Sequence, residues 1–142
     1  MTPLKDACIV DNSVWQRLGS PVVAAALRSL TVAGIRMVTC APQLLEYLWS
    51  ARSPAEYERL HSIMAALPTV DPGTGFAHRA VRLQRALWHN GLVRSVGAAD
   101  IEIAAIALEN DCAIIHYDRD FVQLQRIEPR LRQRAVVPFG AV

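Results

Sequence analysis

The sequence predicts an α/β fold, a three-layer sandwich in which a central parallel sheet is flanked by helices. Short apolar runs such as ACIV (7–10) and CAIIHY (112–117) alternate along the chain with longer segments of helical periodicity. These runs lack the alternating polarity of a half-exposed strand, which indicates a sheet covered on both faces. The 142 residues, with 52% hydrophobic content, are sufficient for one buried core, so we expect a single domain over residues 1–142.

Each expected element rests on a local signal. Pro21 and Gly34 bound the first long helix, because proline suits the first helical turn and glycine the C-terminal cap. A turn-rich connection at 68–75 holds at most a minimal strand around Thr69-Val70. The expected helices are 21–34, 41–50, 54–67, 76–90 and 98–110. The expected strands are 7–10, 35–40, 112–117 and 135–139.

Composition restricts the class of protein. No apolar run approaches the roughly 20 residues of a membrane span, and the N-terminal segment does not fit a signal peptide. Cys8, Cys40 and Cys112 lack the spacing of a zinc site and are expected as buried free thiols. We therefore expect a cytoplasmic protein with no membrane contact. The net charge is +2, and 14 of the 15 basic residues are Arg, a composition that a high-GC coding bias explains and that is compatible with RNA binding.

Five carboxylates fall where a parallel sheet would bring them together. Asp11 follows the first strand, and Asp118 and Asp120 follow the strand that ends CAIIHY. Glu46 lies early in the helix after the second strand, and Asp100 lies near the start of the helix that leads into CAIIHY. Ligands of open parallel sheets bind beyond the carboxyl ends of the strands, so we expect these acids at one edge of the sheet.

Each acid also has a structural interpretation. Asp11 and Asp100 suit a helix cap or first turn, where a carboxylate complements the helix dipole. Glu46 suits a partly exposed helix position, and Asp118 and Asp120 suit a turn. Clustered carboxylates without a counter-charge repel each other strongly, however. A hard divalent cation with oxygen ligands, Mg²⁺ or Mn²⁺, is the simplest group that stabilises such a cluster.

Four motifs in this order resemble those of the PIN-domain ribonucleases, and specifically the VapC toxins of bacterial toxin–antitoxin pairs. The motifs are IVDNSVW, PQLLEYLW, AADIEIAAIAL and IIHYDRDF, and their order and spacing cover nearly the whole chain. The sequence departs from many members at His116, where they have Thr, although a His-Tyr-Asp version also occurs in the family. Other classes fit less well: a haloacid-dehalogenase enzyme needs a second Asp at the position of Ser13, and no glycine-rich nucleotide motif is present.

The resemblance implies a PIN-like fold and a Mg²⁺- or Mn²⁺-dependent endoribonuclease that cleaves RNA by metal-assisted phosphodiester hydrolysis. It also implies a homodimer and a VapB-like antitoxin that blocks the site. Two alternatives stay open. One is a PIN-fold nuclease for RNA processing outside a toxin–antitoxin pair, and the other is a catalytically silent PIN-like binding module.

Residue roles follow from the same motifs. The expected catalytic residues, which are also the expected metal ligands, are Asp11, Glu46, Asp100 and Asp118. The expected auxiliary residues are Asp120, Ser13, Asn12 and Arg119. Ser13 and Asn12 orient water or a phosphate oxygen, or act only as caps, and Arg119 pairs with a neighbouring Asp or with a substrate phosphate. A basic helix face could follow an RNA backbone or simply be solvated; its residues are Arg79, Arg82 and Arg85.

Overall fold

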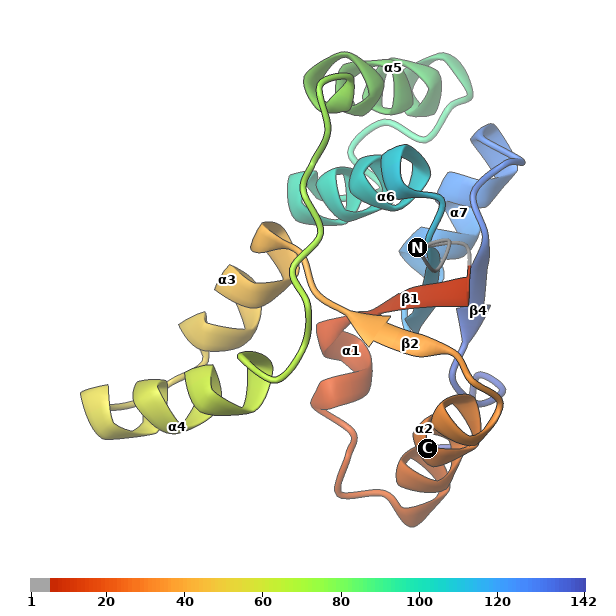
Figure 1. Ribbon diagram of the computed structural model, residues 1–142. Coiled ribbons are helices and arrows are strands. Elements are labelled where there is room, and N and C mark those ends of the chain that lie inside the picture. Colours follow the sequence, from red (N-terminus) through yellow and green to blue (C-terminus); the bar gives the residue numbers. More distant parts are fainter. Residues whose placement is uncertain (1–5) are drawn as a thin grey trace.

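The computed structural model describes residues 6–142 and contains one four-stranded, all-parallel sheet within that range (Figure 1). Its strands are β1 (Ala7–Val10), β2 (Arg36–Val38), β3 (Ala113–His116) and β4 (Gln133–Ala135). The spatial order is β2-β1-β3-β4, so β1 pairs with β2 on one side and with β3 on the other. In the register of the central pair, Val10 lies beside Ile115.

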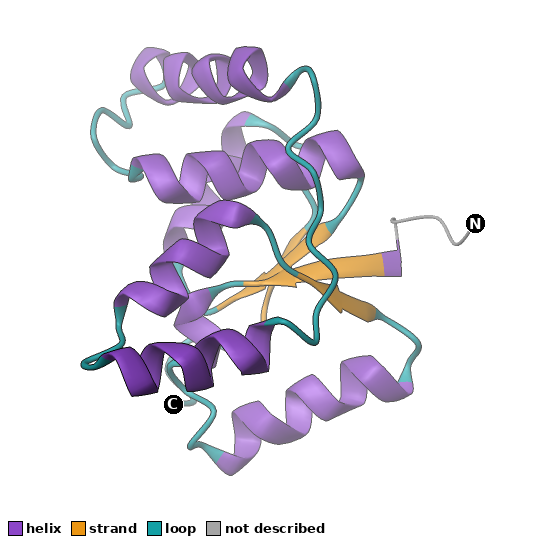
Figure 2. Cartoon of the chain, turned by 60° about the vertical axis from the view of Figure 1, so that its left-hand side comes forward, coloured by secondary structure: helices purple, strands orange, loops and turns teal. Residues whose placement is uncertain are grey.

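Helices cover both faces of this sheet. They are α1 (Asn12–Trp15), α2 (Pro21–Val32), α3 (Ala41–Trp49), α4 (Pro54–Met64), α5 (Phe76–His89), α6 (Ala98–Asn110) and α7 (Arg119–Ile127). In Figure 1, α5 and α6 lie above the sheet and α2 lies below it, while α3 and α4 project to the left. Figure 2 shows α5 stacked on the outer side of α6. The arrangement confirms the predicted three-layer α/β sandwich.

The two layers of core arise from the alternation of side chains along β1. Ala7 and Ile9 pack with residues of α5, α6 and α7 on one face of the sheet. Cys8 and Val10 pack with residues of α1 and α2 on the other. Because successive side chains of a strand point to opposite faces, an all-apolar strand needs cover on both sides.

The expected elements differ from the structure mainly at the C-terminal end. The last strand was expected at 135–139, but β4 is Gln133–Ala135. As the edge strand, β4 accommodates polar residues, whereas Pro138 has no N–H to donate to a ladder. Helix α7 was not predicted, and β2 and β3 are shorter than expected at both ends, whereas β1 has the expected bounds. The minimal strand near Thr69 is present as a parallel bridge to Thr39.

Two compositional expectations can be compared with the structure. Cys8, Cys40 and Cys112 are all buried free thiols, as predicted. Within residues 6–142, none of the helices has the length and apolar character needed to cross a membrane.

Candidate active site

The sheet order places a topological switch point between β1 and β3. The chain passes from β1 to β2 on one side and then returns to place β3 on the other side of β1. The carboxyl ends of β1 and β3 therefore flank the point where the connections diverge, which is the usual ligand site of open parallel sheets. Asp11 lies directly at this point, and its backbone N–H donates to the carbonyl of Ile115 at 2.9 Å.

Asp11 uses only one of its carboxylate oxygens within the protein. Its Oδ2 accepts hydrogen bonds from the Ser13 backbone N–H (3.0 Å) and the Ser13 hydroxyl (2.6 Å), so the residue caps α1. Its Oδ1 is buried and has no hydrogen-bond donor among residues 6–142. A buried carboxylate oxygen without a partner is costly. Asp11 therefore caps α1 through Oδ2, as one interpretation of the sequence predicted, and its Oδ1 is available to a ligand.

Asp118 and Asp120 lie at the start of α7. Asp118 is the N-cap residue, and its Oδ1 accepts the backbone N–H of Asp120 at 2.9 Å. Asp120 lies in the first turn of the helix. Both carboxylates are therefore at the positive end of a helix dipole, which favours negative charge there.

Asp100 completes an acidic cluster from the first turn of α6. Carboxylate oxygens of Asp100, Asp118 and Asp120 lie within 4.8 Å of one another. Burial raises the pKa of Asp100 to about 8, and the charges of Asp11 and Asp118 and a hydrogen bond with Asp120 contribute further. Burial and the charge of Asp118 also raise the pKa of Asp120. Without a cation, Asp100 retains a proton near neutral pH.

These residues fit a hard divalent cation. The donor set consists of carboxylate oxygens, which Mg²⁺ and Mn²⁺ prefer. A bound cation would give the buried Oδ1 of Asp11 a partner, and it would compensate the neighbouring negative charges that, together with burial, raise the pKa of Asp100. The structure thereby brings together four of the five predicted acids: Asp11, Asp100, Asp118 and Asp120.

Glu46 is not part of this cluster. It is exposed on α3, and within residues 6–142 its carboxylate makes no hydrogen bond or ion pair. It is also not among the charges that raise the pKa of Asp100. Asp120, expected as an auxiliary residue, lies within the cluster itself.

Ser13 joins the two strand ends. Its hydroxyl donates to Asp11 and accepts the backbone N–H of Tyr117 at 2.9 Å. It therefore fixes the orientation of the Asp11 carboxylate relative to the segment that carries Asp118.

Asn12 is buried at the contact between the start of α1 and α3. It is 2% exposed, and its side chain makes two hydrogen bonds with Gln43 of α3. Asn12 Nδ2 donates to the backbone carbonyl of Gln43 at 3.1 Å, and Gln43 Nε2 donates to Asn12 Oδ1 at 3.0 Å. Thr39 donates its hydroxyl to Gln43. The amide of Asn12 is thus buried and bonded to α3, and its expected role in orienting water or a phosphate oxygen stays a prediction. Sequence reasoning missed Gln43, whose signal was a polar residue within the apolar segment PQLLEYLW.

Two arginines lie beside the acidic site. Arg119 is exposed, and its guanidinium lies 4.4 Å from the ring centroid of Phe139. No ion pair within residues 6–142 joins it to Asp118 or Asp120, so only the predicted contact with substrate phosphate stays open. Arg17, which sequence reasoning missed, donates to the carbonyl of Ser13 at 2.7 Å and lies over the ring of Tyr117.

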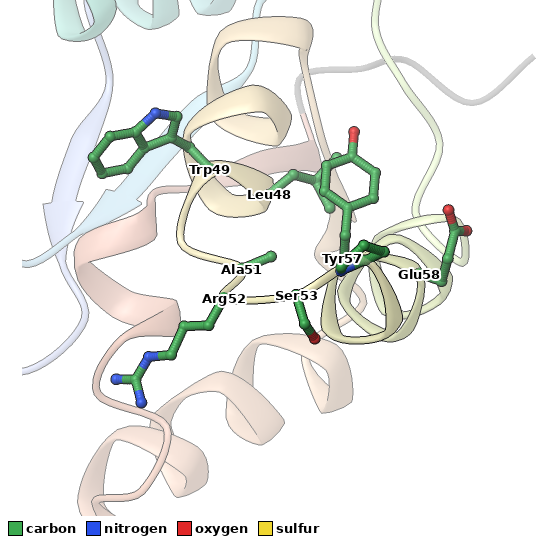
Figure 3. A pocket seen from close by; sticks show the side chains of 8 residues that line it. Leu48, Trp49, Ala51, Arg52, Ser53, Tyr57 and Glu58 are labelled. Carbon is green, nitrogen blue, oxygen red and sulfur yellow. The ribbon is translucent and has the colours of Figure 1, made fainter.

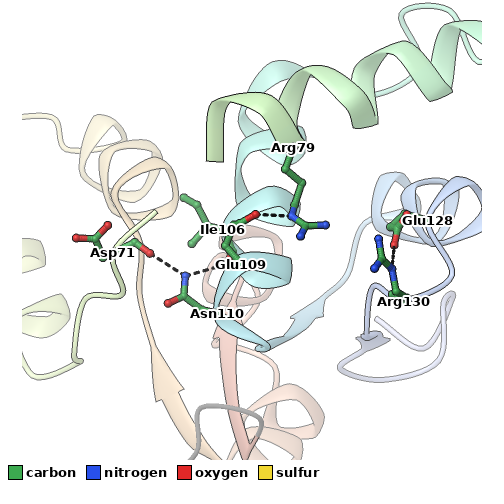
Figure 4. A network of polar contacts seen from close by, with 7 residues as sticks. All are labelled: Asp71, Arg79, Ile106, Glu109, Asn110, Glu128 and Arg130. Carbon is green, nitrogen blue, oxygen red and sulfur yellow. Dashed lines mark hydrogen bonds and ion pairs between the residues drawn. The ribbon is translucent and has the colours of Figure 1, made fainter. Parts of the chain in front are cut away.

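The predicted arginine face of α5 lies away from the aspartates. Arg79 pairs with Glu109 at 2.6 Å (Figure 4). Glu109 lies in the last turn of α6, whereas Asp100 lies in its first turn. Arg79 and Arg82 line one cavity of about 250 Å³, whereas Arg85 lines a different one. The three residues therefore do not form one continuous surface with the acidic site.

A separate pocket lies between α3 and α4. Figure 3 shows Trp49 projecting from the end of α3 and Tyr57 standing on α4. Trp49 is 87% exposed, while its neighbour Leu48 is buried. The pocket lies on the projecting part of the fold and contains none of the four clustered aspartates.

Fold and site together define an α/β protein with a cluster of carboxylates at the switch point of its sheet. The family model of the PIN domain matches residues 8–127, and the chain belongs to this family. Two curated relatives from Mycobacterium tuberculosis (strain ATCC 25618 / H37Rv) are named ribonucleases. Ribonuclease VapC51 is 31% identical over 94% of this chain and 96% of its own length. Ribonuclease VapC18 is 35% identical over 83% of this chain and 87% of its own length.

Solved structures share the fold. VapBC2 from Rickettsia felis, bound to a DNA fragment from its promoter, superposes with a TM-score of 0.74 over 91% of this chain and 98% of that chain, at 15% identity. VapBC-5 from Mycobacterium tuberculosis superposes with a TM-score of 0.62 over 96% and 99%, at 23% identity. The predicted PIN-like fold and the resemblance to VapC ribonucleases are confirmed.

Proposed function

We propose that this protein is a Mg²⁺- or Mn²⁺-dependent endoribonuclease that acts as the toxin of a VapBC-type pair. The observation that carries the proposal is the convergence of Asp11, Asp100, Asp118 and Asp120 at one point of the sheet, with one buried Asp11 oxygen left without a donor. Relatives named ribonuclease support the class of reaction.

The clustered aspartates hold the metal. When bound, a hard dication supplies Lewis-acid activation of water and stabilises negative charge on the phosphate. Asp11 offers its free Oδ1, and Ser13 keeps that carboxylate in place. Asp100 must lose its proton before it can act as a ligand. Glu46 stays a proposed ligand on the family resemblance, in a position more open to solvent than that of the aspartates.

The partners are proposed from the same family. The solved neighbours are VapBC complexes, which supports a VapB-like antitoxin for this chain. RNA is the proposed substrate, and Arg119 is the proposed contact to its backbone beside the acids. A homodimer and a cytoplasmic location complete the proposal as expectations from the family.

Cleavage of RNA by the purified chain tests the enzyme. We expect cleavage with Mg²⁺ or Mn²⁺ and none with EDTA. Asp11→Asn and Asp100→Asn should each lower the rate by at least about 100-fold with folding intact. Asp71→Asn is the matched control, because Asp71 is exposed, its side chain accepts only the backbone N–H of Gly73, and its contact with Asn110 is made by the backbone carbonyl, which the substitution keeps. Equal cleavage by wild type and both site variants would refute the proposal and favour the silent binding module.

Expression in a bacterial host tests the toxin role separately. Growth arrest by wild type but not by Asp11→Asn, relieved by co-expression of a small protein encoded beside it, is the expected result. Metal-dependent cleavage without growth arrest would favour an RNA-processing nuclease instead.

A further inference from the structure

We propose that His116 is a positioning residue for the carboxylate site, acting through the backbone of Asp118 within a directed hydrogen-bond chain that ends on Leu131. This proposal rests on the proposed function only where metal binding is measured. The chain itself consists of four hydrogen bonds among side chains and backbone groups of β3, α7, β4 and the segment that follows α7.

The first link fixes which nitrogen of His116 carries a proton. The backbone N–H of Asp118 lies 3.1 Å from Nδ1 of His116 and can only donate, so Nδ1 must be the acceptor. The proton of the neutral ring is then on Nε2, which donates to Oε1 of Gln133 at 2.5 Å. The two contacts select a single tautomer.

The remaining links keep Gln133 in the required orientation. Its Oε1 faces His116, so its Nε2 donates to Oε1 of Gln125 at 2.8 Å. Gln125 in turn donates from Nε2 to the carbonyl of Leu131 at 3.0 Å. A backbone carbonyl can only accept, and therefore neither amide can turn over without placing two like groups against each other.

His116 cannot contact metal or RNA directly. It is 0% exposed, and its ring packs against Phe121 and Phe139 at centroid distances of 5.1 and 6.2 Å. Both ring nitrogens are already occupied. Its direct hydrogen bond to the site is the one that it accepts from the backbone N–H of Asp118.

The placement of the Asp118 backbone matters because Asp118 is both the N-cap of α7 and a proposed metal ligand. Its Oδ1 caps α7 through the N–H of Asp120, so the placement of its backbone sets both carboxylates of that helix start. A hydrogen bond to the backbone N–H, held from behind by β4 and α7, restrains this placement. Partners of this kind behind ligands typically change metal affinity by 10–100-fold when removed.

Three substitutions separate the two ends of the ring. His116→Asn keeps an acceptor at the position of Nδ1 and loses the group that reaches Gln133. His116→Gln keeps a donor at the position of Nε2 and loses the acceptor for Asp118. His116→Leu removes both. We expect the dissociation constant for Mn²⁺, measured by calorimetry, to rise about 10-fold or more in the Gln and Leu variants and to stay within about threefold in the Asn variant.

A control separates positioning from general loss of stability. Val23→Ala removes buried volume on α2, on the opposite face of the sheet, and touches no member of the chain. It should lower the melting temperature and leave Mn²⁺ affinity unchanged. Wild-type Mn²⁺ affinity in His116→Leu, or a loss in the Asn variant equal to that in the Gln variant, would overturn the proposal.

A second measurement does not depend on metal. Nitrogen-15 NMR of the histidine rings should show His116 as the Nε2–H tautomer alone, and Gln133→Leu should allow a mixture of tautomers. An Nδ1–H tautomer in the wild type would refute the chain of hydrogen bonds whether or not the protein binds Mn²⁺. If the tautomer is as proposed but wild type binds no Mn²⁺, the proposed function fails, and with it the positioning role; the hydrogen-bond chain alone stands.

Discussion

Ser13 donates two hydrogen bonds, from its backbone N–H and its hydroxyl, to the same oxygen of Asp11, and it leaves the other carboxylate oxygen buried without a donor. Asp11 therefore caps α1 with Oδ2 and has Oδ1 available to a ligand. The hydrogen bonds to Oδ2 fix the orientation of the side chain, and Oδ1 is the oxygen whose desolvation no donor compensates.

Removal of the Ser13 hydroxyl should weaken both the site and the fold. Ser13→Ala removes a donor to Asp11 and the acceptor of the Tyr117 N–H, so we expect cleavage to fall about 10–100-fold and stability by about 1–3 kcal/mol. Ser13→Thr keeps the hydroxyl and should retain most activity. Ser62→Ala, on the exposed side of α4, is the control. Kinetics and urea denaturation check the result, and full activity in Ser13→Ala would contradict it.

The metal-free protein should lose stability as pH rises. The pKa of Asp100 is about 8 in the folded chain against an ordinary 3.8, chiefly because the group is buried, so the folded state binds the proton more tightly than the unfolded state does. This contribution is fully present below the unfolded value and is lost as pH increases through about 8. Melting curves in EDTA should therefore shift to lower temperature with pH, and Asp100→Asn should reduce the shift.

Addition of Mn²⁺ should reverse that trend. Ligands must be deprotonated to bind, so the increase in melting temperature with Mn²⁺ should be larger at pH 8 than at pH 5. An increase of the same size at both pH values, or one retained in full by Asp100→Asn, would show that Asp100 is not a ligand.

The buried amide pair of Asn12 and Gln43 should behave as a unit. Gln43→Leu leaves the Asn12 carbonyl oxygen without its donor in the core, and about 1–3 kcal/mol of stability should be lost. The double variant with Asn12→Leu should lose less than the sum of the single variants, because no unpaired amide remains. Denaturant titration of all four proteins gives the coupling. Additive losses would mean that the two amides do not interact.

Substitution of Arg119 should affect the KM for RNA more than substitution of an arginine of α5. Arg119 adjoins Asp118, so Arg119→Ala should raise KM several-fold with kcat nearly unchanged and should make binding less sensitive to salt. Arg82→Ala, on the cavity beside Glu109, should change KM little. The reverse pattern would place the RNA path along α5.

The sequence by itself determined the order of the four strands and of the long helices before β3, but not α7, and it determined the presence of acids just after two of the strands. These are local properties: apolar periodicity sets the elements, and strand ends place Asp11 and Asp118 beyond the sheet. The motifs also identified the PIN family. The start of β4 was beyond this reasoning, because an edge strand such as Gln133–Ala135 has no apolar pattern of its own.

Only the tertiary structure decided which of the five acids lie together and which is exposed on its own. Packing of α6 against the sheet brings Asp100 to Asp118 and Asp120, and the separate course of α3 leaves Glu46 in solvent. It also decided that Asn12 bonds to Gln43 and that His116 faces Gln133, because the partners are separated by 31 and 17 residues of chain. Such pairings depend on how whole elements pack, which local sequence patterns do not encode.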